Sequence, residues 1–244
     1  MARLLAPESF ILKLFTMIRF HRQFDPHPVK LLIFDLDGTL IDSRLDLVHS
    51  VNAMLRHFKR AELPEEVVAS YVGDGAPMLV RRALGDPSDE SLLKEALEYF
   101  LAYYREHKLD HTLPYEGVKE MLAGIRNWNG TRRPMAVLSN KPVHPSRAIV
   151  EALGLAEFFL QVYGGNSFAT KKPDPEGAQN VLREAHALPE ETLMIGDSAI
   201  DVLTGRNAGL WTCGVTYGFD PLSLSLAPPD VTVDSPQELA QLLS

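Results

Sequence analysis

Four short apolar runs limit the folds open to this chain. They are four to six residues long and contain many aliphatic side chains, as is typical of buried strands in a parallel sheet. Helical patterns fill the segments between them, and strands that alternate with helices predict an α/β fold, a doubly wound parallel sheet with helices on both faces. The runs are Lys30–Phe34 (KLLIF), Pro134–Leu138 (PMAVL), Thr192–Ile195 (TLMI) and Trp211–Thr216 (WTCGVT).

Proline, serine and glycine mark the expected ends of the helices between these strands. Proline favours the first turn of a helix, serine caps its start, and glycine closes its end. The pattern predicts helices over Pro145–Leu153 and Glu176–Ala187, and a last helix capped by Ser235 that ends near Leu243. A final strand at Val231–Val233 is expected at the edge of the sheet.

The stretch from about Arg44 to His111 has helical patterns and no comparable strand-like run. We interpret it as an all-helical cap (44–111) inserted into an α/β core formed by residues 28–43 and 112–244. Asp42 and Ser43 either orient the hinge into this insertion or cap its first helix, and capping is the favoured interpretation. Residues 1–27 are interpreted as an N-terminal extension, with an amphipathic helix from Phe10 to Phe20.

Charge and cysteine content exclude several classes of protein. The 244 residues carry a formal net charge of −8, which repels polyanions and argues against general nucleic-acid binding. Cys213 is the only cysteine, so no intramolecular disulfide can form, and a reducing, cytoplasmic location is expected. No apolar stretch approaches the 18 or more residues of a membrane span.

Polar residues follow three of the apolar runs at the point where each strand is expected to end. Asp35 and Asp37 follow the first run, Ser139 and Asn140 the second, and Asp197 the third. Because ligands of open α/β sheets bind beyond the carboxyl ends of the strands, these groups are expected to meet at one edge. The segment Lys171-Lys172-Pro173 supplies a lysine there, and the following proline favours Lys172 over Lys171, although both stay open.

This set of residues needs a cation. Two unit charges 4 Å apart repel by about 4 kcal/mol at an effective dielectric near 20. Oxygen ligands without histidine or cysteine favour Mg²⁺. A carboxylate can also attack phosphorus as a nucleophile, provided that Mg²⁺ and a lysine offset the charge of the phosphate.

The motifs FDLDGTLIDS, SN, KKPDP and GDSAID, in this order, resemble those of the haloacid dehalogenase superfamily of phosphohydrolases, in its phosphoglycolate phosphatase-like branch. The resemblance covers about Lys30–Ser244 and implies that Asp35 is the nucleophile and Asp37 the general acid and base. It also implies that Ser139 and Lys172 grip the phosphoryl group, helped by backbone N–H groups around Gly38, Thr39 and Asn140. The implied Mg²⁺ ligands are Asp35, the carbonyl of Asp37, Asp197 and, nearby, Asp201.

The same resemblance makes the helical insertion a mobile cap that closes over the site and selects the substrate. In it, Gly73-Asp74-Gly75 resembles the specificity loop of phosphoglycolate phosphatases, although a simple turn before Pro77 explains the same residues. Arg81 lies one turn further on and is expected to add positive charge, but because Arg81 and Arg82 point about 100° apart on a helix, at most one of them reaches the site.

These observations predict a Mg²⁺-dependent phosphatase of small phosphomonoesters, with 2-phosphoglycolate favoured. A phosphosugar mutase of the same superfamily, a pyrophosphatase or nucleotidase, and a non-catalytic phosphate-binding protein are the alternatives. The expected partner is a small phosphoester, and monomer and homodimer both stay open.

Overall fold

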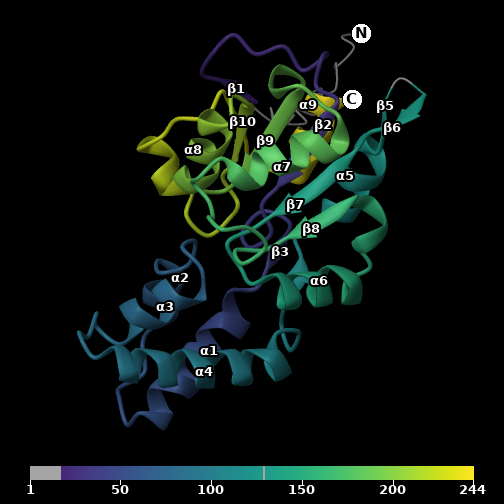
Figure 1. Cartoon of the computed structure of the whole chain (residues 1–244). Helices are drawn as coiled ribbons and strands as arrows, with labels where there is room; N and C mark the ends of the chain where they lie inside the picture. The colour runs from purple at the N-terminus through teal and green to yellow at the C-terminus, as the bar shows by residue number, and fades with distance from the viewer. Residues whose placement is uncertain (1–17, 129) are drawn as a thin grey trace, which may run out of the picture.

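The computed structural model describes residues 18–128 and 130–244. A seven-stranded sheet forms the centre of the larger body, in the order β1-β11-β10-β9-β2-β7-β8 (Figure 1). All neighbouring strands are parallel except β1 and β11, which are antiparallel. This confirms the expected fold class. The strands are β1 (Arg19–Phe20), β2 (Leu31–Phe34), β7 (Met135–Leu138), β8 (Gln161–Tyr163), β9 (Thr192–Gly196), β10 (Trp211–Val215) and β11 (Val231–Val233).

Helices cover both faces of this sheet because successive side chains of a strand point to opposite faces. In β2, Leu32 and Phe34 pack with residues of α5 and α9, whereas Leu31 and Ile33 pack with residues of α7. All four side chains are fully buried, as expected of a central parallel strand. The core helices are α5 (Val118–Ile125), α6 (Val143–Ala152), α7 (Glu176–Ala185), α8 (Ala199–Asn207) and α9 (Pro236–Leu243).

Two expectations were wrong: that Val231–Val233 forms the edge strand, and that all of residues 1–27 form a separate extension. Strand β11 is not the edge strand, because Arg19–Phe20 pairs with it on its outer side. Phe24 is buried and its ring lies 5.3 Å from that of Trp211, edge to face. Residues 19–24 therefore belong to the core and are not a separate extension. Arg19 and Phe20 are also not helical; the expected helix before Ile18, with the rest of residues 1–17, lies outside the described residues.

A smaller helical body, the cap, lies to one side of the core (Figure 1). The chain enters and leaves it through β3 (Ile41–Asp42) and β4 (Leu113–Pro114), which pair antiparallel to each other. The cap confirms the all-helical insertion that the sequence predicted. Its helices are α1 (Arg44–His57), α2 (Glu65–Ala69), α3 (Ala76–Ala83) and α4 (Glu90–His107).

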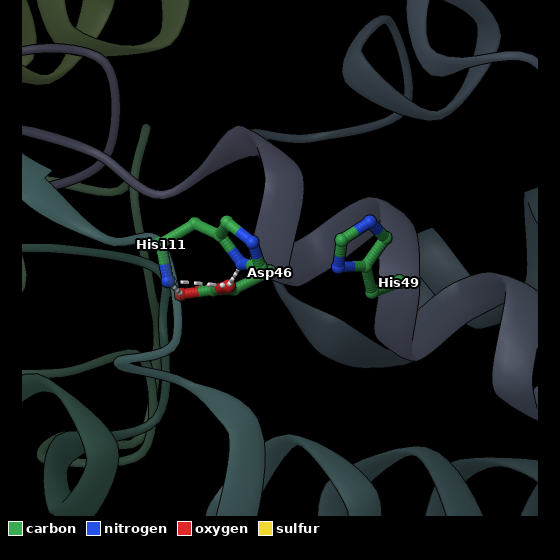
Figure 2. A group of neighbouring side chains, drawn as sticks. All are labelled: Asp46, His49 and His111. Carbon is green, nitrogen blue, oxygen red and sulfur yellow. Dashed lines mark hydrogen bonds and ion pairs between the residues drawn. The ribbon is translucent and has the colours of Figure 1, made fainter.

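Asp46 joins the two segments that connect the cap to the core (Figure 2). Its carboxylate lies in the first turn of α1, is 1% exposed, and accepts hydrogen bonds from the backbone N–H groups of His111 and Thr112, the Thr112 hydroxyl and the His111 ring. His49 packs its ring edge to face on His111. The ligand atoms of Asp46, His49 and His111 lie within 4.8 Å of one another, but the carboxylate is already saturated with donors, so we assign this group a structural role.

In the described part of the chain, residues 18–128 and 130–244, no helix has the length and apolar character needed to cross a membrane.

Candidate active site

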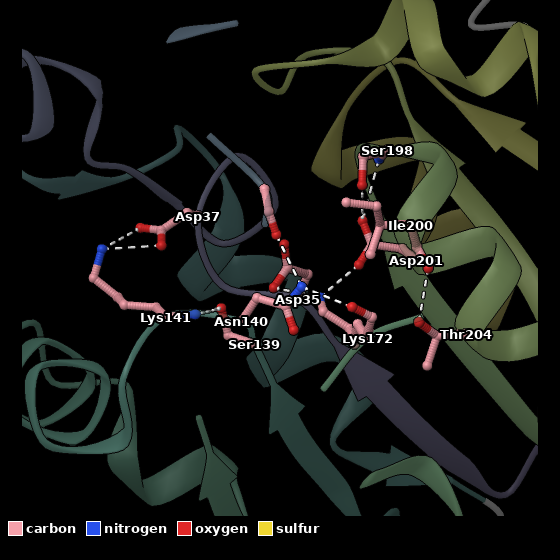
Figure 3. A network of polar contacts seen from close by, with 11 residues as sticks. Asp35, Asp37, Ser139, Asn140, Lys141, Lys172, Ser198, Ile200, Asp201 and Thr204 are labelled. Carbon is pink, nitrogen blue, oxygen red and sulfur yellow. Dashed lines mark hydrogen bonds and ion pairs between the residues drawn. The ribbon is translucent and has the colours of Figure 1, made fainter. Parts of the chain in front are cut away.

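The candidate site lies at the carboxyl edge of the sheet (Figure 3), and residues of the cap line the same cavity. Asp35 directly follows β2, Ser139 follows β7, and Asp197 follows β9. Lys172 reaches the same place from the loop before α7, and Asp201 from the first turn of α8. The five side chains line one cavity. Parallel strands bring these groups together because all their carboxyl ends meet at one edge.

Three buried carboxylates lie together in the cavity, and two of them, Asp35 and Asp201, contact one ammonium group. Oxygen atoms of Asp35, Asp197 and Asp201 lie within 4.8 Å of one another. Lys172 Nζ lies 2.8 Å from Asp35 Oδ1 and 2.6 Å from Asp201 Oδ1. Burial raises the pKa of Asp35 to about 6, against the opposing effect of Lys172. Burial, followed by the charges of Asp201 and Asp35, raises the pKa of Asp197 well above its usual value.

This arrangement fits a divalent cation. With all groups ionised, three carboxylates and one ammonium leave two uncompensated negative charges in a buried site, which is unfavourable unless a cation is present. The donors are oxygen atoms only, the set that Mg²⁺ prefers. Backbone N–H groups of Phe219 and Asp220 donate to Asp197 Oδ2 at 2.6 and 3.2 Å and hold that carboxylate in place.

Asp201 makes hydrogen bonds in two directions, to the start of helix α8 and to Lys172. Its Oδ2 accepts hydrogen bonds from the Ser198 hydroxyl and backbone N–H, while its Oδ1 holds Lys172. The residue therefore caps α8 and positions the lysine at the same time. We regard Asp35 and Asp197 as the better cation ligands of the three, because Asp201 is already held by these donors.

Asp37 lies on the other side of the loop after β2 and faces a second buried lysine, Lys141. The Lys141 ammonium lies 2.9 Å from both carboxylate oxygens of Asp37. The Ser43 hydroxyl also donates to Asp37, so Ser43 occupies the N-cap position of α1 but its side chain makes no capping hydrogen bond. The Asp42 side chain accepts from the Arg44 N–H. The sequence analysis missed Lys141, although it directly follows Ser139-Asn140 at the end of a buried strand.

The two lysines of the KKP segment take different positions. The Lys172 side chain is 3% exposed and lies in the site. Lys171 points to the cap, where its Nζ donates to the carbonyl oxygen of Asp74. Asn140 also contacts the cap: its side-chain amide donates to the carbonyl oxygens of Gly73 and Lys172 at 2.9 and 3.0 Å. The core therefore holds the Gly73-Asp74 loop directly.

The backbone N–H groups of Gly38 and Thr39 were expected to bind phosphate, but they make hydrogen bonds within the loop after β2. The Gly38 N–H donates to the carbonyl oxygen of Ile41, and the Thr39 N–H to that of Leu36. Neither N–H is free for a phosphate, because the chain turns tightly after β2 and satisfies its own backbone groups. Gly38 instead provides space: its φ is +82°, and a Cβ atom there would lie 2.2 Å from Asp197 Oδ2.

The cap residues divide into those that reach the cavity and those that do not. Gly73 and Gly75 line it, but Asp74 and Arg81 do not. Asp74 pairs with Arg82, and Arg81 pairs with Asp86 and Glu90. The expectation that Arg81 adds charge to the site is therefore wrong, because Asp86, after α3, and Glu90, at the start of α4, hold its guanidinium. The cap side of the cavity is mostly apolar and includes Leu47, Val72, Leu79, Phe100, Leu101 and Tyr104.

The family of the chain follows from comparison with known proteins. A model of the haloacid dehalogenase-like hydrolase family matches residues 32–215. The chain belongs to this family. Within it, the chain is similar to proteins named phosphoglycolate phosphatase. The protein of Chromobacterium violaceum is 36% identical over 219 residues, covering 88% of this chain and 96% of that protein. The protein of Vibrio vulnificus is 40% identical over 228 residues, covering 88% and 95%.

Solved structures agree with this assignment. The crystal structure of a predicted phosphoglycolate phosphatase from Haemophilus somnus 129PT superposes with a TM-score of 0.83 at 29% identity, covering 89% of this chain and 99% of that one. The expected family and the expected class of enzyme, a phosphoric monoester hydrolase similar to phosphoglycolate phosphatases, are thereby confirmed.

Proposed function

We propose that this enzyme is a Mg²⁺-dependent phosphatase of small phosphomonoesters, with 2-phosphoglycolate as the favoured substrate, and that it acts through an aspartyl-phosphate on Asp35. The observation that carries the proposal is the placement of Asp35 and Asp37 in one cavity. Asp35 lies beside Lys172, at 2.8 Å, and Asp37 beside Lys141. In this proposal, Asp35 meets the phosphorus and Asp37 meets the leaving group.

In the first step, an Asp35 carboxylate oxygen forms a bond to phosphorus as the ester P–O bond breaks. The leaving alkoxide takes a proton from Asp37. In the second step, Asp37 takes a proton from water, the water oxygen attacks phosphorus, and the P–O bond to Asp35 breaks, which releases phosphate and restores the carboxylate. The same group thus serves as acid and then as base.

Other side chains stabilise charge around the transferring group. Ser139 and Lys172 line the cavity beside Asp35 and are proposed to donate hydrogen bonds to the phosphoryl oxygens. The carboxylates of Asp35 and Asp197 and the backbone carbonyl of Asp37 would hold Mg²⁺, with Asp201 nearby, and the bound ion would supply positive charge against the phosphate. The cap excludes water from the cavity during the first step.

The names of the relatives support the choice of substrate. The proteins of Chromobacterium violaceum and Vibrio vulnificus are named phosphoglycolate phosphatase, and each aligns with 88% of this chain.

A substrate panel tests the proposal. The purified chain with Mg²⁺ is assayed for phosphate release from 2-phosphoglycolate, a hexose phosphate, a nucleoside monophosphate and pyrophosphate, and kcat/KM is determined for each. We expect the highest value for 2-phosphoglycolate and loss of all phosphate release in Asp35→Asn. Circular dichroism checks that this variant folds.

Each main outcome separates the alternatives. A higher kcat/KM for pyrophosphate or nucleotides would favour a pyrophosphatase or nucleotidase. Isomerisation of a hexose phosphate without net phosphate release would indicate a mutase. Wild-type rates in Asp35→Asn would refute the mechanism.

A further inference from the structure

Lys141 occupies a position that the catalytic steps above do not fully explain. Its side chain is 5% exposed and lines the cavity. The ammonium contacts both oxygens of Asp37 at 2.9 Å and lies 4.7 Å from the ring centre of Tyr104, on cap helix α4. Figure 3 shows Lys141 facing Asp37. Because Tyr104 belongs to the cap, Lys141 lies where the core meets the cap, on the proposed leaving-group side of the cavity.

Cationic groups around the cavity are few. Among its described lining residues, Lys141 and Lys172 are the two that carry positive charge. Lys172 is held between Asp35 and Asp201, at the proposed phosphoryl position. Arg81 and Arg82 pair with acidic residues outside the cavity. A second negative group on a substrate can therefore meet a lysine only at Lys141.

Tyr104 adds an independent observation that indicates a ligand. The residue is 3% exposed and lines the same cavity. Its hydroxyl donates a hydrogen bond to no described residue, while the neighbouring Lys141 ammonium acts on its pKa. A buried O–H group without an acceptor is unfavourable. Burial raises the pKa of Tyr104 to about 12, so the hydroxyl keeps its proton at neutral pH and can donate a hydrogen bond.

We propose that Lys141 and Tyr104 form the receptor for a carboxylate on the alcohol part of the substrate, and that this pair makes the enzyme select carboxylated phosphomonoesters. An ammonium group has three N–H donors, and Asp37 accepts from two of them. The substrate carboxylate takes the remaining donor and the tyrosine hydroxyl. This inference rests on the proposed function, because it assigns the recognition of the leaving group in that same site.

The receptor also explains why the cap needs no arginine in the cavity. The core supplies the charge through Lys141, and the cap supplies a neutral donor through Tyr104 with an apolar wall around it. Charged hydrogen bonds are stronger in such a dry environment than in water. Because Lys141 belongs to the core and Tyr104 to the cap, a substrate carboxylate can accept from both only when the cap is closed over the cavity.

Two matched substrates test the proposal. They are 2-phosphoglycolate and 2-hydroxyethyl phosphate, in which an uncharged CH₂OH group replaces the carboxylate. The measured quantity is the ratio of their kcat/KM values. We expect the wild type to favour 2-phosphoglycolate. The ratio should fall roughly 10- to 100-fold in Lys141→Met, the range for losing a hydrogen bond to a charged group.

Taking the ratio is necessary because Lys141 also contacts Asp37, so its loss lowers kcat for both substrates. Tyr104→Phe keeps the ring and removes only the hydroxyl; it should raise KM for 2-phosphoglycolate about fivefold, by the loss of one hydrogen bond, and leave KM for 2-hydroxyethyl phosphate little changed. Lys141→Arg keeps the charge and should restore part of the ratio. Lys119→Met, on the exposed surface of α5, is the control for removal of a lysine.

The outcomes separate this inference from the proposed function. If the wild type hydrolyses neither compound, the proposed function fails. If it hydrolyses both equally well, or if Lys141→Met keeps the wild-type ratio, the enzyme is a phosphatase but the carboxylate receptor is refuted.

Discussion

The side-chain amide of Asn140 donates a hydrogen bond to the carbonyl oxygen of Gly73, at 2.9 Å. Asn140 follows strand β7 of the core, and Gly73 lies in the loop before cap helix α3. A residue at the edge of the sheet thus holds the cap in position over the cavity. Lys171 makes a second link, to the carbonyl oxygen of Asp74.

These links predict how the cap loop can be loosened. Lys171→Met removes one link without changing a residue that lines the main cavity. We expect amide hydrogen exchange over residues 72–76 to become several-fold faster and KM to rise, because the closed cap loses a hydrogen bond of about 1 kcal/mol. Unchanged exchange in this loop would show that Lys171 does not hold it. Asn140→Ala should have a larger effect, since Asn140 also contacts the Lys172 carbonyl.

The buried carboxylates predict a response to Mg²⁺ that does not depend on activity. We expect the melting temperature to rise by several degrees with MgCl₂, because a ligand at 100 times its Kd stabilises the folded state by about 2.7 kcal/mol. In Asp197→Asn this rise should be lost. A wild-type response in this variant would place the cation elsewhere.

The same variant tests the electrostatics of the metal-free protein. Burial and two neighbouring carboxylates raise the pKa of Asp197, so its ionised form lowers the stability of the folded state at neutral pH. Without Mg²⁺, Asp197→Asn should therefore melt no lower than the wild type at pH 7.5, and the difference should shrink as the pH falls and Asp197 takes up a proton. A much lower melting temperature would mean that hydrogen bonds from Phe219 and Asp220 dominate.

Gly38 predicts a steric requirement at the metal site. Its φ is +82°, and an added Cβ would lie 2.2 Å from Asp197 Oδ2. Gly38→Ala should displace Asp197, abolish the stabilisation by Mg²⁺ and lower activity strongly. Gly85→Ala is a matched control, because Gly85 has a φ of +79° but no atom within 4 Å of the added Cβ. The control should lose only about 1–2 kcal/mol of stability, from the left-handed backbone. Equal effects of the two variants would contradict the steric argument.

Asp46 predicts acid sensitivity of the connection between the cap and the core. Burial alone would raise the pKa of Asp46, but hydrogen bonds from Thr112 and His111 together lower it. A carboxyl group with a lowered folded-state pKa stabilises the protein above its unfolded pKa of about 4, and this stabilisation disappears as the pH falls through the folded-state value. Asp46→Asn should therefore cost about 2–3 kcal/mol at pH 7, and the loss should decrease as the pH falls below about 4. Thermal melts over this range of pH measure the decrease, and a loss that does not change with pH would rule out the role of the charge.

Local patterns in the sequence were enough to predict five of the seven strands of the sheet, the helical cap and the position of Asp35, Ser139 and Asp197. A buried parallel strand needs a continuous apolar run, and the residue after the run must lie at the carboxyl edge of the sheet. These relationships involve only neighbouring residues in the chain, and the family motifs then supplied the chemistry. The proline after Lys172 also favoured this lysine over Lys171, and Lys172 is the one that lines the cavity.

Tertiary structure decided the features that depend on where side chains point and which distant groups meet. In the folded chain, Lys141 pairs with Asp37, and Arg81 pairs with Asp86 and Glu90. The Gly38 N–H makes its hydrogen bond within the loop after β2. Tertiary structure also added Arg19–Phe20 to the edge of the sheet, a pairing with a segment more than 200 residues away. Apolar periodicity determines which face of an element is buried, but the partner of each charge is chosen only when the packed elements bring the two groups within reach.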